Sequence, residues 1–528
     1  MPYHQDPHPT GSATLAALLA LLPLVTLLVL LGGLRWKAHS AGLAALAVAL
    51  LVAVLGFGMP PLPAADAGLY GMAQSTLLIL WLTFNAIWIY NLTVRSGHFA
   101  VLRRAFGSLS SDVRVQAVVI AFSFGALLEA LAGGGGPVAI CSVMLIALGV
   151  APLRAAALAL VADTAPVAYG GMGNPITILG EVTGIPAAEF GAVVGRQVPV
   201  LAVLVPFVLL VVADGRRGLR EAWPAALTGG LSFAVAQFAT SNYLSYQLAD
   251  IVSAIASAAA LLVLLRFWRP ARSEVDDPDP APDAAGERLR AFAPYAIIVV
   301  VFGLVQFDAV KAPLEVLTWE FDWPGLTVLD PGGAPVDTTY EFDIGSSTGT
   351  LLLLSGLLAL IPLRVSPAAA VRVYGATIRQ FGWAIVAILA VFALSYVMNL
   401  SGQISALGTW LAGTGGLFAF LSPVVGWFGV TVTGTDAGAN ALFGSLQTTA
   451  AAQLGADPVL LGSANSAGGV MAKMISPQNL AIGTAAVGLV GREGELFRRV
   501  FGWSLLLLLV LCVLVYLQST PVLGWMLP

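Results

Sequence analysis

The sequence predicts an all-α integral membrane protein with about 12 transmembrane helices, two re-entrant helical hairpins and an inverted-topology repeat that contains discontinuous helices. Three observations predict this fold. The 528 residues are 58% hydrophobic and 10% charged, whereas a soluble domain is about one quarter charged. Apolar stretches of about 20 residues, long enough to cross a bilayer, recur along the chain. Polar and glycine-rich segments interrupt these stretches at corresponding places in two halves of the chain.

The predicted spans follow from the length and hydropathy of each apolar stretch. A helix that crosses a bilayer needs about 20 mostly apolar residues, and the mean hydropathy of the chain is +0.90. The first stretch is longer than a signal-peptide core and has no basic segment before it, so we expect a spanning helix there. The predicted spans are 13–34, 38–57, 69–93, 154–183, 190–213, 222–241, 246–267, 291–308, 346–363, 377–399, 457–490 and 502–525.

Two further apolar stretches, 113–150 and 417–453, are interrupted by polar segments. We predict that each is a helix–turn–helix hairpin that enters and leaves the bilayer on one side. The first contains "LEALAGGGGPVAI" (128–140), which places Glu129 one turn before four glycines. Irregular backbone at membrane depth is tolerated where it lines a cavity, and an ionisable residue there usually marks a substrate or ion path. Glycines also let backbone N–H groups and helix N-termini approach an anion.

Lysine and arginine in short loops predict the orientation of the spans, because these residues gather on the cytoplasmic side. They follow the first, third, fifth and ninth predicted spans, separate the seventh from the eighth, and precede the last. If this face is cytoplasmic, both termini lie outside. The acidic segment 315–343 then also lies outside, and the Pro/Asp/Ala-rich segment 269–290 is expected to be a disordered cytoplasmic linker.

An internal repeat relates the two halves of the chain. The segment "ADTAPVAYGGMGNPITI" (162–178) aligns with "ANSAGGVMAKMISPQNL" (464–480). Basic residues flank the first hairpin, so it opens to the cytoplasm, whereas the second has none nearby and opens outside. Inverted repeats with discontinuous helices are typical of secondary transporters, whose site lies near the midplane at the repeat interface. The matched pairs are Asp163 with Asn465, Thr164 with Ser466, Pro175 with Pro477, Gly134 with Asp436 and Gly136 with Gly438.

The repeat divides the chain into three parts. The first half is 1–213, connecting helices and the linker occupy 214–290, and the second half is 291–528. Each half contains one hairpin followed by one broken helix. These are 113–150 with 154–183 in the first half, and 417–453 with 457–490 in the second.

Polar residues and glycines at the hairpin tips and helix breaks form the candidate substrate site. A structural role is the alternative for each of them, because Asp and Asn cap helices and polar side chains satisfy backbone groups freed at a proline. Their corresponding positions in the two halves favour a shared site. The predicted substrate-binding residues are Gly133, Gly134, Gly135, Gly136, Thr164, Asn174, Asp436, Asn440, Asn465, Ser466, Lys473, Ser476 and Gln478.

Lys473 is the only lysine deep in an apolar stretch of the second half. A buried ammonium needs an anionic partner. We expect Lys473 to pair with a substrate carboxylate, or with Asp436 when no substrate is bound.

The predicted proton-coupling residues are Glu129, Asp163 and Asp436, because none of the four histidines lies at mid-membrane depth. Burial disfavours the charged form of a carboxyl group and so favours proton binding. Glu129 ranks first because its own hairpin offers no cation, and Asp163 ranks second. Asp250, near the end of a predicted span, is interpreted as interfacial.

Other classes of function have little support in the sequence. The two cysteines lie in apolar segments and are interpreted as core residues, and no spacing suggests a metal site, a cofactor site or a nucleophile–base pair. These patterns argue against an enzyme. No basic patch suggests nucleic acid, and no signalling domain supports a sensor.

Several long motifs resemble the bacterial L-lactate permease family. The resemblance covers most of the chain and is most specific over 430–499. It departs from the family pattern at the glycines of the first hairpin, at Asp163 and at Asn174. The motifs are "SFGALLEALAGGGGPVAI", "DTAPVAYGGMGNPI", "LSYVMNLSG", "GVTVTGTDAGANALFGSLQTTAA" and "ANSAGGVMAKMISPQNLAIGTAAVGLVGREGELFR".

This resemblance implies a transporter that imports L-lactate, and also glycolate or D-lactate, by proton symport across the bacterial inner membrane. Its expected partners are therefore a small monocarboxylate, protons and the lipid bilayer. The alternative is a Na⁺-coupled carboxylate symporter of the same architecture, in which hairpin carbonyls and the pairs Asp436/Asn440 and Asn465/Ser466 hold the ion.

Overall fold

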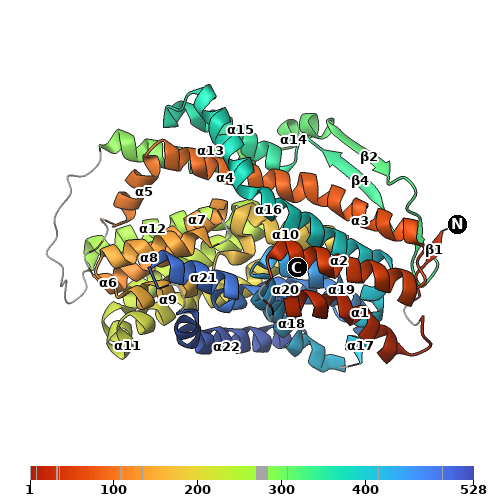
Figure 1. Cartoon of the computed structure of the whole chain (residues 1–528). Coiled ribbons are helices and arrows are strands. Elements are labelled where there is room, and N and C mark those ends of the chain that lie inside the picture. Colours follow the sequence, from red (N-terminus) through yellow and green to blue (C-terminus); the bar gives the residue numbers. More distant parts are fainter. Residues whose placement is uncertain are drawn as a thin grey trace.

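The computed structural model describes the chain except at residues 1, 7–8, 31–33, 35, 108–109, 111, 133–134, 269–283, 306, 414 and 490–491. The described residues form a helical assembly with two small sheets at one edge (Figure 1). Six of the described helices are long and apolar enough to cross a membrane, or up to nine if each bent pair counts as one span. The chain is therefore an α-helical, multi-pass membrane protein, and the 12 predicted spans stay a prediction.

The first predicted spans are helices whose ends differ from the predicted ones. The third starts earlier than residue 69, at Pro61, because proline fits the first turn of a helix, and it continues without interruption to Arg95. The elements here are α1 (Ala13–Leu28), α2 (Ala38–Leu51), η2 (Val52–Gly56), α3 (Pro61–Ser75), η3 (Thr76–Trp81), α4 (Leu82–Arg95) and α5 (His98–Gly107).

The residues of the first predicted hairpin form helical segments that pack against each other. Gly135 has φ +89°, a left-handed conformation that favours glycine, and it precedes the helix that begins at Gly136. A broken helix follows, in which the parts before and after the break meet at 63°. The elements are α6 (Val113–Gln116), η4 (Ala117–Phe124), α7 (Gly125–Ala132), α8 (Gly136–Ala147), α9 (Pro152–Ala162), η5 (Val167–Tyr169) and α10 (Gly170–Thr183).

Helix α11 (Ala187–Tyr243) folds back on itself, because Asp214 and Gly215 have non-helical backbone angles. Arg196 Nε of one arm donates to Asn242 Oδ1 of the other at 2.9 Å. The two arms correspond to the spans predicted at 190–213 and 222–241. The elements that follow are η6 (Tyr246–Leu248), α12 (Ala249–Phe267) and α13 (Ala285–Leu304). Residues 269–283 of the predicted linker 269–290 lie outside the described residues. Helix α13 begins at Ala285, within the predicted linker.

In the predicted second half, two packed helices are again followed by a helix that is interrupted, at Lys473–Ile475. The last predicted span, 502–525, begins earlier than expected, at Glu493, because two acidic residues extend the first turn of the helix. The elements are α14 (Asp308–Glu315), α15 (Thr348–Leu363), α16 (Pro367–Leu400), α17 (Gln403–Ala412), η7 (Gly415–Leu417), α18 (Phe418–Thr433), α19 (Asp436–Leu454), α20 (Pro458–Ala472), η8 (Lys473–Ile475), α21 (Pro477–Ala486), α22 (Glu493–Gln518) and η9 (Gly524–Met526).

The all-α prediction is wrong for the acidic segment 315–343, which contains strands. Strands β2 (Thr318–Asp322) and β4 (Thr339–Asp343) pair antiparallel, because aromatic residues alternate with polar ones on both and stack across the pair. The other sheet joins β1 (Tyr3–His4) to β3 (Val328–Leu329) in parallel. The N-terminal segment and the predicted outer segment therefore lie on the same face (Figure 1).

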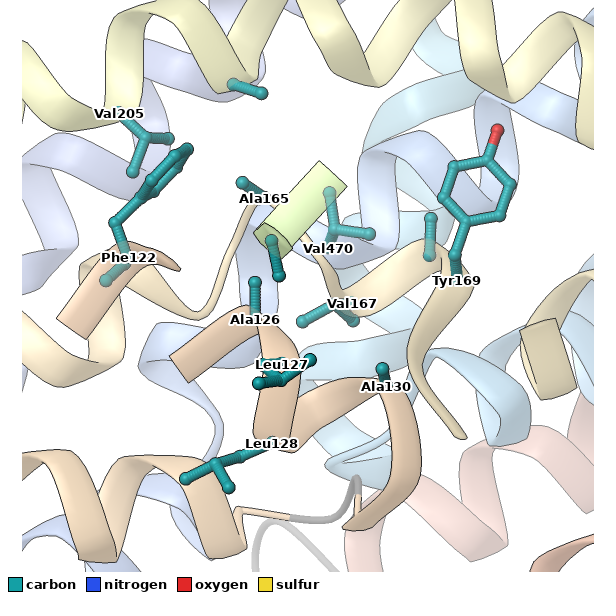
Figure 2. Packing of buried hydrophobic residues seen from close by; sticks show 14 of the residues in the cluster. Phe122, Ala126, Leu127, Leu128, Ala130, Ala165, Val167, Tyr169, Val205 and Val470 are labelled. Carbon is teal, nitrogen blue, oxygen red and sulfur yellow. The ribbon is translucent and has the colours of Figure 1, made fainter. Parts of the chain in front are cut away.

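The apolar core surrounds the helix interruptions. Figure 2 shows Ala126, Leu127 and Ala130 of α7 near Val167 of the first break and Val470 of α20. A second buried cluster joins α1, α2 and α3 to α16 and α17. Segments from both predicted halves are thus packed against each other at the breaks.

Candidate functional site

Both hairpin turns and both helix breaks meet in the protein interior. Helix α10, after the first break, packs against α19 of the second hairpin. Helix α21, after the second break, packs against α8 of the first hairpin. Each hairpin therefore contacts the broken helix of the other half.

The first break is wider than a single proline kink. Gly171, Met172 and Gly173 have φ values of +55°, +61° and +74°, a left-handed conformation that is rare for a non-glycine residue such as Met172. The regular part of α10 thus begins near Asn174. A Cβ on Gly170 would lie 2.8 Å from Glu129 Oε1. Only glycine at this position lets the first hairpin approach the break so closely.

The second break is tied to its own hairpin turn by side-chain caps. Ser476 Oγ accepts a hydrogen bond from Asn479 N at 3.4 Å and so caps α21. Asn479 Nδ2 donates to Gly434 O at 3.1 Å, in the turn between α18 and α19. Thr435 caps α19 by accepting from Gly438 N at 3.1 Å. Ser476, a predicted substrate ligand, thus serves here as a cap.

A buried charge cluster joins the two halves. Lys473 Nζ lies 2.5 Å from Glu129 Oε1 and 2.9 Å from Asp163 Oδ2. The side chains of Lys473, Glu129 and Asp163 are 5%, 3% and 3% exposed, so water screens these charges little. Removing one member of a buried ion pair typically costs about 3–5 kcal/mol. The three residues therefore form one coupled unit.

This arrangement corrects two predictions. Lys473 pairs with Glu129 and Asp163 and not with Asp436, which instead accepts a hydrogen bond from Ser466 Oγ at 2.5 Å. Glu129 does have a cationic neighbour, but it comes from the other half of the chain. Inspection of the hairpin alone could not find it, because 344 residues separate the pair.

A chain of amide side chains also crosses between the halves. Gln447 Nε2 donates to Asn465 Oδ1 at 3.3 Å, and Asn465 Nδ2 donates to Asn440 Oδ1 at 2.9 Å. Asn440 Nδ2 then donates to Pro175 O, beyond the first break, at 3.0 Å. The amide groups of Asn440 and Asn465 are therefore engaged in holding α19, α20 and α10 together.

A cavity of about 490 Å³ contains part of the charge cluster. Its lining includes five predicted site residues, Glu129, Asn174, Asp436, Lys473 and Gln478. The remaining predicted residues within the described part of the chain lie outside the lining, whereas Gly133 and Gly134 are outside the described residues. Those outside the lining are Gly135, Gly136, Asp163, Thr164, Asn440, Asn465, Ser466 and Ser476.

Sequence reasoning missed several residues of the cavity wall. Thr83 of α4 lines it, and so do His39 of α2 and Trp383 of α16, whose rings stack with centroids 4.4 Å apart. No sequence signal distinguishes these residues, because each lies in an ordinary apolar helix. The glycine spacing in "GGMG" (170–173) could have indicated the width of the first break.

Asp250 is not interfacial as predicted. It is 0% exposed, and its Oδ1 accepts a long hydrogen bond of 3.5 Å from Gln237 Nε2. The same amide nitrogen donates to Ala165 O, in the first break, at 3.2 Å. The turn that precedes α12 packs against α11 and buries the first turn of α12, which explains the error.

The described residues contain no group of three or more His, Cys, Asp or Glu side chains that could hold a metal ion. Cys141 and Cys512 are buried and not bonded to each other. The chemistry that the cavity itself offers is recognition of an anion by one ammonium, with carboxyl groups that can bind protons.

Comparison with known proteins gives the family of the chain. The family model for L-lactate permease matches residues 16–522. The chain is 40% identical to the glycolate permease of Escherichia coli K12 over 97% of both chains, and 40% identical to the L-lactate permease of Bacillus subtilis over 94% of both. It is 38% identical to the L-lactate permease of Escherichia coli K12 over the full length of both.

Two solved transporters resemble the fold more distantly. The YdaH transporter of Alcanivorax borkumensis aligns with a TM-score of 0.47 and 16% identity, over 86% of this chain and 88% of its own. MtrF of Neisseria gonorrhoeae aligns with a TM-score of 0.45 and 13% identity, over 85% of this chain and 82% of its own. The near full-length match at 40% identity decides the assignment: the chain is a multi-pass transporter of the bacterial inner membrane, not an enzyme, and belongs to the L-lactate permease family.

Proposed function

We propose that the protein imports L-lactate and related 2-hydroxymonocarboxylates such as glycolate by proton symport. The observation that carries this proposal is the position of Lys473, which lines the cavity and contacts two carboxylates, Glu129 and Asp163. The names of the relatives, L-lactate permease and glycolate permease, support the substrate class. A monocarboxylate presents one anionic group, which one ammonium can neutralise.

Competition for Lys473 couples the proton to the substrate. The ammonium contacts both Glu129 and Asp163. A proton that binds either carboxyl group removes one negative charge and frees the ammonium for the substrate carboxylate. Loss of that proton inside the cell returns the carboxylate to Lys473 and expels the substrate.

The charge of the site is the same at both ends of this cycle. Within the cluster of Lys473, Glu129 and Asp163, one ammonium and two ionised carboxylates carry one net negative charge before a proton and a substrate bind. One bound proton and one bound monocarboxylate add charges that cancel. The empty and loaded forms therefore meet the same electrostatic cost in the membrane, which favours a ratio of one proton to one substrate.

We also propose the membrane architecture that the sequence predicts, with 12 spans, two re-entrant hairpins and an inverted repeat. The meeting of both hairpins with both breaks supports it, because repeat-built transporters place their site at such an interface. The sheet between β1 and β3 supports an outer location for the N-terminus, on the face of the acidic segment.

An imposed gradient in proteoliposomes tests the coupling ion. An acid-outside pH gradient should drive accumulation of labelled L-lactate, and a proton ionophore should abolish it. Empty liposomes must be run in parallel, since undissociated lactic acid crosses lipid unaided. Accumulation that follows an inward Na⁺ gradient and ignores the pH gradient would establish the Na⁺-coupled alternative.

An exposed residue of the cavity lining indicates the face of the membrane toward which the cavity opens. Trp383 lines the cavity and is 69% exposed. Arg379 precedes it on α16, and Lys37 precedes His39, whose ring stacks on Trp383. Because basic residues mark the cytoplasmic face, we infer that the cavity opens inward. Ala437, in the second hairpin, lines the same cavity.

Cysteine accessibility tests the inverted repeat. In a background with Cys141 and Cys512 replaced, an impermeant thiol reagent should reach Ala132→Cys from the cytoplasm. Ala437→Cys should react from the cytoplasm in the conformation described here and from outside in the opposite one. Labelling in right-side-out and inside-out vesicles separates the cases. Reaction of both cysteines from a single side under every condition contradicts the inverted repeat.

A further inference from the structure

Four buried oxygen atoms on the cavity wall have no hydrogen-bond partner within the described part of the chain. They belong to Glu129 (Oε2), Asp436 (Oδ1), Asn174 (Oδ1) and Thr83 (Oγ1). A buried polar atom without a partner is unfavourable, so an unpaired group that faces a cavity is available to a ligand. Three of the four can only accept a hydrogen bond when the carboxylates are ionised.

We propose that Asn174 recognises the 2-hydroxyl group of the substrate, with Thr83 as a second contact, and so selects 2-hydroxymonocarboxylates over unsubstituted ones. This inference rests on the proposed function, because it assigns the part of the substrate that Lys473 does not bind. The hydroxyl group is the only donor in an ionised 2-hydroxymonocarboxylate. It therefore requires an acceptor on the wall.

Charge decides which acceptor suits that hydroxyl group. The hydroxyl lies next to the substrate carboxylate, so an ionised Glu129 or Asp436 in contact with it would repel the substrate. The side-chain amide of Asn174 is neutral. Its oxygen can accept from the hydroxyl group while its nitrogen donates to an oxygen of the substrate.

The backbone places Asn174 close to the charge cluster. Gly170 is in contact with Glu129, whose Oε1 lies 2.5 Å from Lys473 Nζ. The left-handed residues 171–173 then turn the chain, so that Asn174 faces the same cavity as Lys473. In a 2-hydroxymonocarboxylate the hydroxyl group is on the carbon next to the carboxylate. The residue that binds the hydroxyl group must therefore lie close to Lys473, the residue that binds the carboxylate.

Thr83 reaches the cavity from another helix. It lies on α4, which packs against α10, and its hydroxyl can both donate and accept. Two helices would thus contribute hydrogen-bonding groups to the subsite for the hydroxyl group. These groups would bind a hydroxylated substrate but not its unsubstituted analogue. The analogue would leave both groups buried and unpaired, which is the physical basis of strong discrimination.

The test compares L-lactate with propionate, which has the same carbon skeleton without the hydroxyl group. Purified protein in proteoliposomes should take up L-lactate, and propionate should compete weakly. In Asn174→Leu, which keeps the size of the side chain but removes its polar atoms, the preference for L-lactate over propionate should fall by about tenfold, of the order of one hydrogen bond. Thr83→Val should lower the same preference by a smaller factor.

Asn91→Leu is the matched control, because Asn91 lies on α4 outside the cavity lining and donates to Thr377 Oγ1 at 2.8 Å. It should leave the preference unchanged. If Asn174→Leu does not transport, ligand-dependent thermal stabilisation of purified Asn174→Ala measures the same preference. An unchanged preference, or equal loss of affinity for both acids, overturns the assignment. Failure of the wild-type protein to take up either acid counts against the proposed function instead.

Discussion

Replacement of Lys473 by alanine is expected to abolish L-lactate uptake while the protein still reaches the membrane. Lys473 is the only cation among the cavity-lining residues of the described chain, apart from His39 when that ring is protonated. Without it, the substrate carboxylate would meet Glu129 and Asp436 with no opposing charge. Repulsion between charges in a low-dielectric cavity makes the binding free energy less favourable by far more than the loss of one surface ion pair does.

The same change should have a smaller effect on folding than the loss of a buried ion pair suggests. Breaking a buried pair costs about 3–5 kcal/mol when the partner stays charged. Glu129 lines the cavity, where water can solvate the carboxylate that has lost its partner. We therefore expect Lys473→Ala to be expressed, with lower thermal stability than the wild-type protein.

Uptake assays and the amount of protein in the membrane must be measured together. Lys311→Ala is the matched control, because Lys311 is 52% exposed and pairs only at the surface with Glu315. It should transport normally. Lys473→Arg should remain impaired, because a planar guanidinium does not reproduce the contacts of a compact ammonium. Wild-type uptake kinetics in Lys473→Ala would remove Lys473 from the substrate site.

The residue types of the charge cluster could be predicted from the sequence, but their pairing could not. Glu129, Asp163 and Lys473 are identifiable because ionisable groups in apolar segments are costly and therefore functional. Which carboxylate contacts the lysine depends on how two distant halves pack. The sequence suggested Asp436, which lies in the same predicted half as the lysine, whereas packing brought Glu129 and Asp163 from the other half.

The fold shows the same division between local and long-range information. Hydropathy indicated most helices, because apolar length is a local property. Burial of Asp250 depends on the packing of α12 against α11, which no local pattern reveals. The strands at 315–343 were missed because composition was interpreted there as an outer loop, although the alternation in "TWEFD" and "TYEFD" is typical of paired strands.

Replacement of Glu129 by glutamine is expected to separate proton coupling from substrate movement. Glutamine resembles the protonated acid in shape and charge but cannot release a proton. In that variant Lys473 keeps only Asp163 as an anionic partner. The ammonium is therefore permanently more available to the substrate carboxylate, as it is in the protonated wild-type site.

Two transport assays on the same variant measure this separation. Exchange of labelled for unlabelled L-lactate needs no net proton movement, so Glu129→Gln should retain it. Accumulation against a concentration gradient needs the proton to leave inside, so an acid-outside pH gradient should no longer drive it. Glu315→Gln is the control, since Glu315 is an exposed carboxylate that should affect neither assay.

Comparison of Glu129→Gln with Asp163→Asn decides which of the two carboxylates carries the proton. Both carboxylates contact Lys473, but only Glu129 lines the cavity, where a proton and the substrate can reach it together. Asp163 lies outside the cavity lining, at the end of α9 where the first break begins. If Glu129→Gln still concentrates L-lactate in response to pH, Glu129 is a structural partner of Lys473. In that case Asp163→Asn should lose the accumulation instead, because Asp163 is the other carboxylate that contacts the lysine.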